Sequence, residues 1–305
     1  MIELDAQTRT ILWIGIGIYT LTMLAIGYIS GRRVKDMNDF LVAGRRLPLW
    51  MATATLLATW FGAGSSMGVA ATVYSGSLRD VIADPFAAAI SLILAGFFIV
   101  GYLRKMNCYT VTDIILKKYG KRASVYASLW MIPVYVGWLG AQMLGLGTIL
   151  HLLTGINMLW GTIIGAVVIL VYTASGGMWA VTLTDIVQVS LIVLGLVIIV
   201  PGAVNLAGGW ETVYNNPQAD LSLLPAKDQG GWDGTINYLG NWMVMGLGCM
   251  VGQDLVQRSL ASRTEGIAKQ SSIYSGILYI IIGMIPITIG LAAKLVFPKF
   301  GITAE

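Results

Sequence analysis

The chain has 305 residues, of which 56% are hydrophobic and 11% are charged, and its 19 basic and 15 acidic side chains leave a formal charge of +4. Soluble domains carry about 25% charged residues, so this composition excludes a disordered protein and strongly disfavours a water-soluble enzyme. It predicts a protein that is embedded in a lipid bilayer.

Eight segments of the chain reach or approach the length of about 20 apolar residues that a helix needs to cross the hydrocarbon core. They cover residues 8–30, 48–75, 82–103, 123–152, 157–175, 180–205, 236–256 and 271–296. The sequence therefore predicts an all-α, multi-pass integral membrane protein. We expect it in the cell (plasma) membrane.

Basic residues gather in alternate loops, namely those after the first, third and seventh segments. These loops hold Arg32, Arg33, Lys35, Arg45, Arg46, Arg104, Lys105, Lys117, Lys118, Lys121, Arg122, Arg258, Arg263 and Lys269. The loop between the sixth and seventh segments is acidic, with Glu211, Asp220, Asp228 and Asp233 beside a single Lys227. Because cytoplasmic loops collect Lys and Arg, we expect the basic loops inside and both ends of the chain outside. Basic loops can also attract anionic lipid head groups, although the regular alternation favours orientation as their role.

The second segment carries helix-weakening residues at its middle: Gly62, Gly64, Ser65, Ser66 and Gly68. Glycine lowers helix propensity, and serine offers the backbone other hydrogen bonds. A broken helix persists in hydrocarbon only where its freed backbone groups are buried in protein or line a wet cavity, and carbonyls released there can coordinate Na⁺. A close helix–helix contact through small residues explains the same pattern equally well.

The seventh segment repeats this pattern. Gly246, Gly248 and Gly252 interrupt it near its middle, and Gln253 and Asp254 follow toward its inner end. The two interrupted segments lie five segments apart and have opposite predicted orientations, as an inverted repeat requires. Two such segments at corresponding places in two halves indicate the binding site of a transporter.

Ionisable and aromatic residues within the segments are further candidates. Asp185 stands where the fifth segment turns into the sixth, as a functional carboxylate or as a residue that complements a helix N-terminus. Asp84, just before Pro85, is expected to begin the third segment from the outer face. Trp60 lies beside the first interruption and Trp138 within the fourth segment, where their rings can hold a quaternary ammonium group or simply pack.

Three motifs make the chain resemble the sodium/solute symporter family, which includes sodium/glucose, proline and choline transporters. They are Phe40-Leu-Val-Ala-Gly-Arg45, Ser175-Gly-Gly-Met-Trp-Ala-Val-Thr-Leu-Thr-Asp185-Ile-Val-Gln188 and Gly252-Gln-Asp-Leu-Val-Gln-Arg258. The resemblance covers nearly the whole chain and keeps the order of the segments. It implies a leucine-transporter-like core of two inverted five-helix repeats, preceded by one extra helix.

This resemblance implies a single membrane domain over residues 1–305. Residues 1–47 would form the extra N-terminal helix and a cytoplasmic loop, and 48–205 the first five-helix repeat. An extracellular loop would cover 206–235, and 236–305 would be the first two helices of the second repeat. The second repeat is then incomplete, and we interpret the chain as truncated before the eighth core helix.

The resemblance also implies a sodium site and a coupling apparatus. The backbone carbonyls of Ala58 and Phe61 would bind one Na⁺ together with hydroxyls of the eighth core helix. We expect Asp185 and Gln253 to act in coupling or gating.

The expected solute-binding residues lie beside the two interruptions. Trp60 and Trp138 match tryptophans of the cage in choline-type members, whose third tryptophan has no counterpart in this sequence. Met245 and Cys249 occupy positions that face the solute in proline-type members. Ser65, next to Trp60 at the first interruption, completes the set.

The sequence therefore predicts a sodium-coupled secondary symporter that imports a small organic solute, choline-like or proline-like, by alternating access. Its partners would be the solute, Na⁺ as the co-transported ion and the lipid bilayer, with no nucleic acid. A non-transporting membrane scaffold or sensor built on a symporter core is the alternative. A membrane-embedded enzyme is not expected, because Asp185, Asp254 and His151 fall at different predicted depths.

Overall fold

A computed structural model describes residues 5–216, 221–224 and 232–300. All the elements assigned within these ranges are helices. The chain divides into two compact units. The first comprises Met1–Leu47 and Cys108–Thr184, and the second comprises Pro48–Asn107 and Asp185–Glu305.

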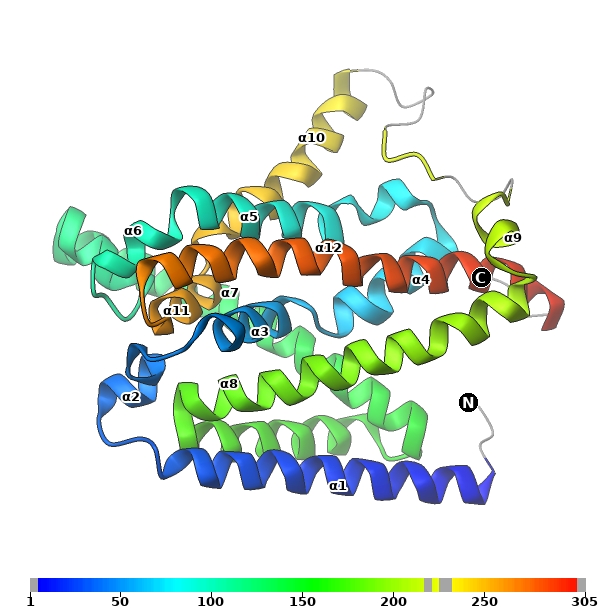
Figure 1. Cartoon of the computed structure of the whole chain (residues 1–305), viewed down its shortest axis with the longest axis horizontal. Coiled ribbons are helices and arrows are strands. Elements are labelled where there is room, and N and C mark those ends of the chain that lie inside the picture. Colours follow the sequence, from blue (N-terminus) through cyan, green and yellow to red (C-terminus); the bar gives the residue numbers. More distant parts are fainter. Residues whose placement is uncertain (1–4, 217–220, 225–231, 301–305) are drawn as a thin grey trace. The chain divides into compact units, whose positions relative to one another are not determined.

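Long helices joined by a short basic connection make up the first unit. Its elements are α1 (Ala6–Gly31), α2 (Met37–Val42), the 3₁₀ turn η1 (Ala43–Arg45), α7 (Val111–Thr154) and the first arm of α8 (Met158–Ala207). Figure 1 shows α1, in blue, running beside this arm of α8. Glycine allows the close approach, because a Cβ at Gly27 would lie 2.7 Å from the Cβ of Tyr172.

α7 begins at a capping box, in which the Thr110 hydroxyl accepts from the Asp113 N–H at 3.1 Å and the Asp113 carboxylate accepts from the Thr110 N–H at 3.0 Å. Gly120, with a φ of +84°, interrupts the helix. The segment predicted at 123–152 therefore corresponds to the longer part that follows Gly120. Only 6% of the most apolar stretch of α7 is buried, which suits a helix that faces lipid.

α8 contains 50 residues, or about 75 Å of helix at 1.5 Å per residue, which is more than twice the thickness of a hydrocarbon core. Gly177 breaks it with a φ of +52° and a ψ of −138°. The segments predicted at 157–175 and 180–205 are therefore its two arms. A Cβ at Gly177 would lie 2.7 Å from a ring carbon of Phe40, so the break also needs glycine for space.

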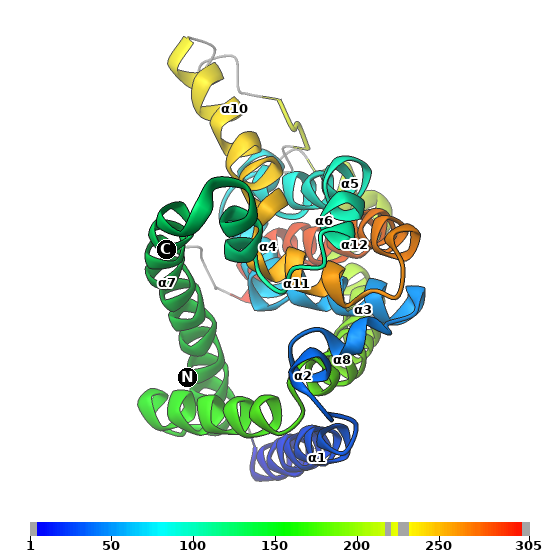
Figure 2. The same ribbon diagram turned by 90° about the vertical axis from the view of Figure 1, so that its left-hand side faces the viewer.

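The second unit holds both interrupted segments. Its elements are α3 (Leu49–Trp60), η2 (Gly64–Gly68), α4 (Val69–Ser75), η3 (Leu78–Val81), η4 (Ile82–Ala87), α5 (Ala88–Phe98), α6 (Val100–Lys105), the second arm of α8, α9 (Trp210–Tyr214), α10 (Trp232–Gly246), η6 (Gly248–Val251), α11 (Gln253–Ala261), α12 (Glu265–Val296) and η7 (Phe297–Phe300). Figure 2 shows α5, α6 and α12 side by side.

α12 is the packing centre of the second unit, and Figure 1 shows it in orange and red along α5. Three glycines seven residues apart place its backbone against neighbours. A Cβ would lie 2.7 Å from the Ala89 carbonyl oxygen at Gly276, 2.5 Å from the Pro85 Cβ at Gly283, and 2.6 Å from the Ala70 carbonyl oxygen at Gly290. These close contacts fix how α5, η4 and α4 lie against α12.

The predicted all-α, multi-pass architecture is confirmed. By length and composition, five helices of the described residues can cross a membrane, or six when the bent pair of α3 with η2 and α4 is counted as one span. The segment predicted at 236–256 is divided among α10, η6 and α11, and the one predicted at 271–296 begins earlier, at Glu265.

The loop predicted at 206–235 contains α9, whereas Asp220, Lys227 and Asp228 lie outside the described residues. The two compact units cut across the predicted repeats, since 48–107 and 185–205 pack with the helices after 236. The repeat boundaries themselves stay a prediction.

Candidate functional site

The first interruption is a true break of the helix. α3 and the helical segment Gly64–Ser75 are bent by 61° relative to each other. Phe61, with φ −88° and ψ 85°, leaves the helical conformation. A Cβ at Gly62, Gly64 or Gly68 would meet no atom within 4 Å, so these glycines do not serve a close helix contact. Of the two interpretations of this segment, the structure therefore favours the break.

A second break separates α10 from α11. The chain passes through the 3₁₀ turn η6 and leaves it at Gly252, with φ −60° and ψ 143°. A Cβ at Gly246 or Gly248 would have its nearest neighbours at 3.8 and 4.0 Å, which is ordinary contact. Both interrupted segments of the sequence are thus interrupted helices in the same unit.

A hydrogen bond joins the two breaks. The indole Nε1 of Trp60, the last residue of α3, donates to Asp254 Oδ2 at 2.6 Å. Asp254 lies in the first turn of α11, directly after the second break. A carboxylate at a helix N-terminus is stabilised by the helix dipole, so α11 and the indole hold this group from two sides.

Three side chains gather around the first break. Ser65 Oγ donates to Asp84 Oδ2 at 2.6 Å, and the Tyr279 hydroxyl donates to Asp84 Oδ1 at 2.9 Å. The two hydroxyl oxygens are 2.6 Å apart, and both lie within 3.1 Å of the Trp60 carbonyl oxygen. Ser65 and Tyr279 are buried, with exposed fractions of 2% and 1%, whereas Asp84 is half-buried.

The cluster has fewer hydroxyl hydrogens than acceptor groups, which favours the binding of a cation. Two hydroxyl hydrogens serve a carboxylate with two oxygens and a carbonyl, so acceptor lone pairs outnumber donors. Asp84 forms no ion pair with any described residue. A carboxylate inside a span needs a compensating charge or hydrogen-bond donors. The cluster of Asp84, Ser65 and Tyr279, here called the oxygen cluster, can therefore receive a positively charged group.

Ala58 and Phe61, the two residues expected to bind Na⁺, flank the end of α3. The last four carbonyls of a helix have no partner within it. Of these, the Leu57 carbonyl accepts from the Phe61 N–H at 2.8 Å, and the Trp60 carbonyl oxygen lies 3.1 and 3.0 Å from the hydroxyl oxygens of Ser65 and Tyr279. The Ala58 carbonyl belongs to the same last turn, so its place suits a cation ligand. Its sodium-binding role stays a prediction.

Asp185 is buried at the start of the second unit's arm of α8, with an exposed fraction of 8%. It accepts a hydrogen bond from the Thr55 hydroxyl of α3, which lies more than one turn before the break. Arg258 of α11 supplies positive charge nearby, and its Nη1 lies 3.4 Å from the Asp254 carbonyl oxygen. This carboxylate thus links α8 to α3 and lies near α11, and its role in coupling stays a prediction. Gln253 begins α11 beside the second break.

The remaining expected residues belong to different units. Met245 and Cys249 lie together at the second break, with their sulfur atoms 3.6 Å apart. Trp138 belongs to α7 of the first unit, is 44% exposed, and packs edge-on against Tyr135 with ring centroids 6.4 Å apart. Within the second unit, Trp60 and Ser65 are the expected residues that meet directly in the hydrogen-bonded site.

Sequence reasoning gave Asp84 no role in binding and missed Tyr279. Asp84 does not begin the third segment, because the helical segment starts at Leu78 and Asp84 lies inside it. Its extended backbone, with φ −140° and ψ 117°, is the conformation that a residue before proline favours, so Pro85 was the available signal. Tyr279 gave no signal, since one tyrosine in an apolar helix is typical of packing.

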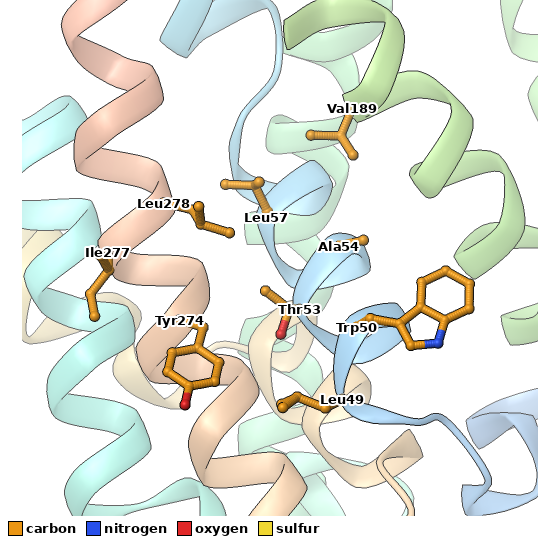
Figure 3. A pocket seen from close by; sticks show the side chains of 9 residues that line it. All are labelled: Leu49, Trp50, Thr53, Ala54, Leu57, Val189, Tyr274, Ile277 and Leu278. Carbon is orange, nitrogen blue, oxygen red and sulfur yellow. The ribbon is translucent and has the colours of Figure 1, made fainter.

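A separate groove of about 720 Å³ lies along α3, α8 and α12 (Figure 3). It is lined by Leu49, Trp50, Thr53, Ala54, Leu57, Val189, Tyr274, Ile277 and Leu278. The lining has no charged side chain, and it includes none of the residues of the oxygen cluster. The groove therefore does not fit a charged solute.

The chain is similar to transporters of several solutes. It is 27% identical over 294 residues to the high-affinity choline transporter 1 of Drosophila melanogaster, covering 92% of this chain and 45% of that protein. It is 29% identical to the human high affinity choline transporter 1, covering 91% and 49%. A sodium/glucose cotransporter of Vibrio parahaemolyticus is 24% identical, with 92% and 54% covered. The chain thus spans about half the length of the curated relatives that it matches.

The fold is also that of a solved symporter. A Na⁺-coupled sialic acid symporter, in a substrate-bound outward-open state, superposes with a TM-score of 0.85 at 22% identity, covering 96% of this chain and 62% of that one. The model of the family described as "SSF: Sodium:solute symporter family" matches residues 40–303. The chain belongs to the sodium:solute symporter family.

Proposed function

We propose that this chain belongs to a sodium-coupled symporter that imports a small organic cation. The chain would be the part of that symporter in which both broken helices lie. The observation that carries the proposal is the family match over residues 40–303, which includes both breaks. The hydrogen bond from Trp60 to Asp254 supports it, because it joins the two breaks into one site.

The solute class follows from the charges at this site. Asp84 and Asp254 are both carboxylates. The Trp60 indole N–H donates to Asp254, and the Ser65 hydroxyl lies between the Trp60 carbonyl and Asp84. An ammonium group is attracted by carboxylates and by the face of an indole. Choline transporters among the relatives support the same class. A carboxylate, rather than a third tryptophan, would then supply attraction from the second broken helix.

Sodium would bind on the cytoplasmic side of the solute. The Ala58 and Phe61 carbonyls would contribute two ligands, and the buried Asp185, linked to Thr55, would sense the ion through α3. Na⁺ would stabilise one arrangement of the bent pair, and the solute would bind beside Trp60, Ser65 and the Met245–Cys249 stretch. The loaded form would then favour occlusion and inward opening.

The membrane location also belongs to the proposal. The basic loops would face the cytoplasm and both ends of the chain the outside, in the plasma membrane. Na⁺ would then enter from the outside down its gradient, and this movement would drive the uptake of the solute.

Uptake into proteoliposomes tests this function. The full-length protein that contains this chain should take up radiolabelled choline, or a related ammonium compound, faster with an inward Na⁺ gradient than with an equal K⁺ gradient. Proline and glucose serve as zwitterionic and neutral comparisons. Uptake that ignores Na⁺ for every solute would contradict symport. Solute binding without any uptake would instead favour the sensor alternative.

Asp84→Asn tests the cation-binding role of the oxygen cluster. The amide keeps the shape of the side chain but removes its charge, so the KM for an ammonium solute should rise by tenfold or more. Glu211→Gln, which removes an exposed carboxylate of α9, is the matched control and should leave uptake unchanged. If both variants transport like the wild type, the cluster does not bind the solute's charge.

A further inference from the structure

The segment that follows α1, from Arg32 to Leu47, places arginines on aromatic rings in the first unit. The Arg33 guanidinium lies 5.5 Å and that of Arg46 5.8 Å from the centroid of the Trp179 ring. The Arg45 guanidinium lies 5.3 Å from the ring of Tyr109 and donates to the Cys108 carbonyl at 3.1 Å.

The backbone that presents Arg45 and Arg46 is strained. Ala43, Gly44 and Arg45 have φ values of +50°, +60° and +57° in succession, and two of the three are not glycine. Left-handed non-glycine residues are costly and persist only where their surroundings impose them, often at functional sites. Asp39 anchors the turn, since its carboxylate pairs with Arg46 and accepts from the Lys35 N–H at 3.2 Å. Positive charge in a loop is enough to orient a membrane protein. A strained turn that fixes the place of the arginines is not needed for that role.

The positive charges of this segment are exposed, and they outnumber the carboxylates that pair with them. The side chain of Arg46 remains 59% exposed despite its ion pair with Asp39. Arg33 and Lys35 are exposed and form no ion pair with any residue in the described ranges. The ring contacts therefore hold Arg33 and Arg46 at one place without neutralising Arg33.

This place is at the end of a membrane-spanning helix. α1 is apolar over 26 residues and ends at Gly31, directly before Arg32 and Arg33. One turn earlier Tyr28 is 66% exposed, and Arg32 lies over its ring at 5.1 Å. Aromatic rings at a span's end lie at the level of the lipid head groups.

We propose that Arg33 and Arg46, which both lie over the Trp179 ring, bind the phosphate of an anionic phospholipid together with Lys35, two residues after Arg33. Planar guanidinium groups bind phosphate oxygens in pairs, and Arg33 and Arg46 are fixed on the same ring. The acyl chains of such a lipid would lie along the apolar surface of α1. A basic residue near an anionic lipid surface contributes about a fivefold change in affinity.

Lipid retention by the full-length protein that contains this chain, purified in detergent, tests this proposal, with native mass spectrometry as the readout. Phosphatidylglycerol and phosphatidylcholine with identical acyl chains are titrated separately. The wild type should retain phosphatidylglycerol more strongly, and Arg33→Gln should weaken its retention about fivefold. Lys121→Gln removes an exposed basic residue elsewhere in the first unit and should have no effect. Equal weakening by both variants, or equal retention of both lipids, would overturn the proposal.

Two measurements on the wild type separate a charge-dependent lipid site from a site for a soluble anion. Raising the ionic strength should weaken retention of phosphatidylglycerol and not of phosphatidylcholine, because exposed charges are screened by salt. This comparison decides the question even if Arg33→Gln does not fold. Inorganic phosphate should displace the lipid only weakly. Displacement by phosphate at the same concentration as the lipid would show a site for a soluble anion and overturn the lipid assignment.

Discussion

Tyr279 has more contacts with the oxygen cluster than its place in an apolar helix suggests. Its hydroxyl reaches Asp84, Ser65 and the Trp60 carbonyl within 3.0 Å, while its ring packs edge-on against Phe61 with centroids 5.4 Å apart. One side chain thus ties α12 to the break and to the carboxylate. A packing tyrosine would need only the ring contact.

Tyr279→Phe separates these two roles, because it keeps the ring and removes the hydroxyl. It leaves buried acceptors without a donor, which costs about 1–3 kcal/mol. The thermal midpoint in detergent should fall by several degrees, and the affinity for an ammonium solute should also fall. Tyr274→Phe on the same helix is the matched control, since Tyr274 is 46% exposed. Equal midpoints for the two variants would show that the Tyr279 hydroxyl is dispensable.

At the residue scale, the sequence predicted that Trp60 and Ser65 lie beside the break. It could not predict which carboxylates they contact. The partners of Trp60 and Ser65 are Asp254 and Asp84, which lie 194 and 19 positions away along the chain. Periodicity and local propensity report on a helix and its ends. They do not report which distant carboxylate a hydroxyl or indole will contact.

The glycines at the first break have a different role from the closely packed glycines elsewhere in the same unit. None of Gly62, Gly64 and Gly68 has a positive φ, and a Cβ on each has free space. Their contribution is therefore low helix propensity, which lets the segment bend. Gly276, Gly283 and Gly290 of α12 have the opposite role, because neighbouring atoms fill the space of their missing side chains.

Gly62→Ala should therefore preserve the fold but slow transport. Alanine favours a helix over glycine by about 1 kcal/mol, so it biases the break toward a continuous helix. The thermal midpoint should be equal to or above that of the wild type, and the uptake rate should fall several-fold. Gly15→Ala in α1, also with no atom within 4 Å of the added Cβ, is the control and should not change uptake. Unchanged uptake in Gly62→Ala would mean that the break does not move during transport.

Gly283→Ala should instead destabilise the second unit. The added Cβ would lie 2.5 Å from the Cβ of Pro85, so α12 and η4 must separate. Overpacking of this kind costs about 1–3 kcal/mol. Gly266→Ala near the start of α12 makes the same change where the nearest atom is 3.9 Å away, and it should not lower the midpoint. A thermal melt of both variants in one detergent compares them directly, and matching midpoints would refute close packing at Gly283.

At the scale of the whole molecule, hydropathy located the apolar segments because each must satisfy its backbone hydrogen bonds internally. The division into units could not be predicted in this way. It depends on the close contacts of α12 with α5, η4 and α4, which are possible because Gly276, Gly283 and Gly290 have no side chains. The two broken segments could be predicted, since their glycines and serines weaken the helix locally.

Both breaks lie in one unit, and this arrangement predicts coupled binding of Na⁺ and solute. Na⁺ at the Ala58 and Phe61 carbonyls and a solute at Trp60 would act on adjoining atoms of α3, so each ligand should favour the same bent arrangement. Linkage requires that each then raises the affinity of the other by one common factor, typically about 5–150-fold. Equilibrium binding of a radiolabelled ammonium solute at several Na⁺ concentrations, and of Na⁺ at several solute concentrations, measures that factor twice. Asp185→Asn should reduce it, because the neutral amide weakens the link through Thr55 to α3. Solute affinity that stays constant from zero to saturating Na⁺ would show that the broken helix does not couple the two sites.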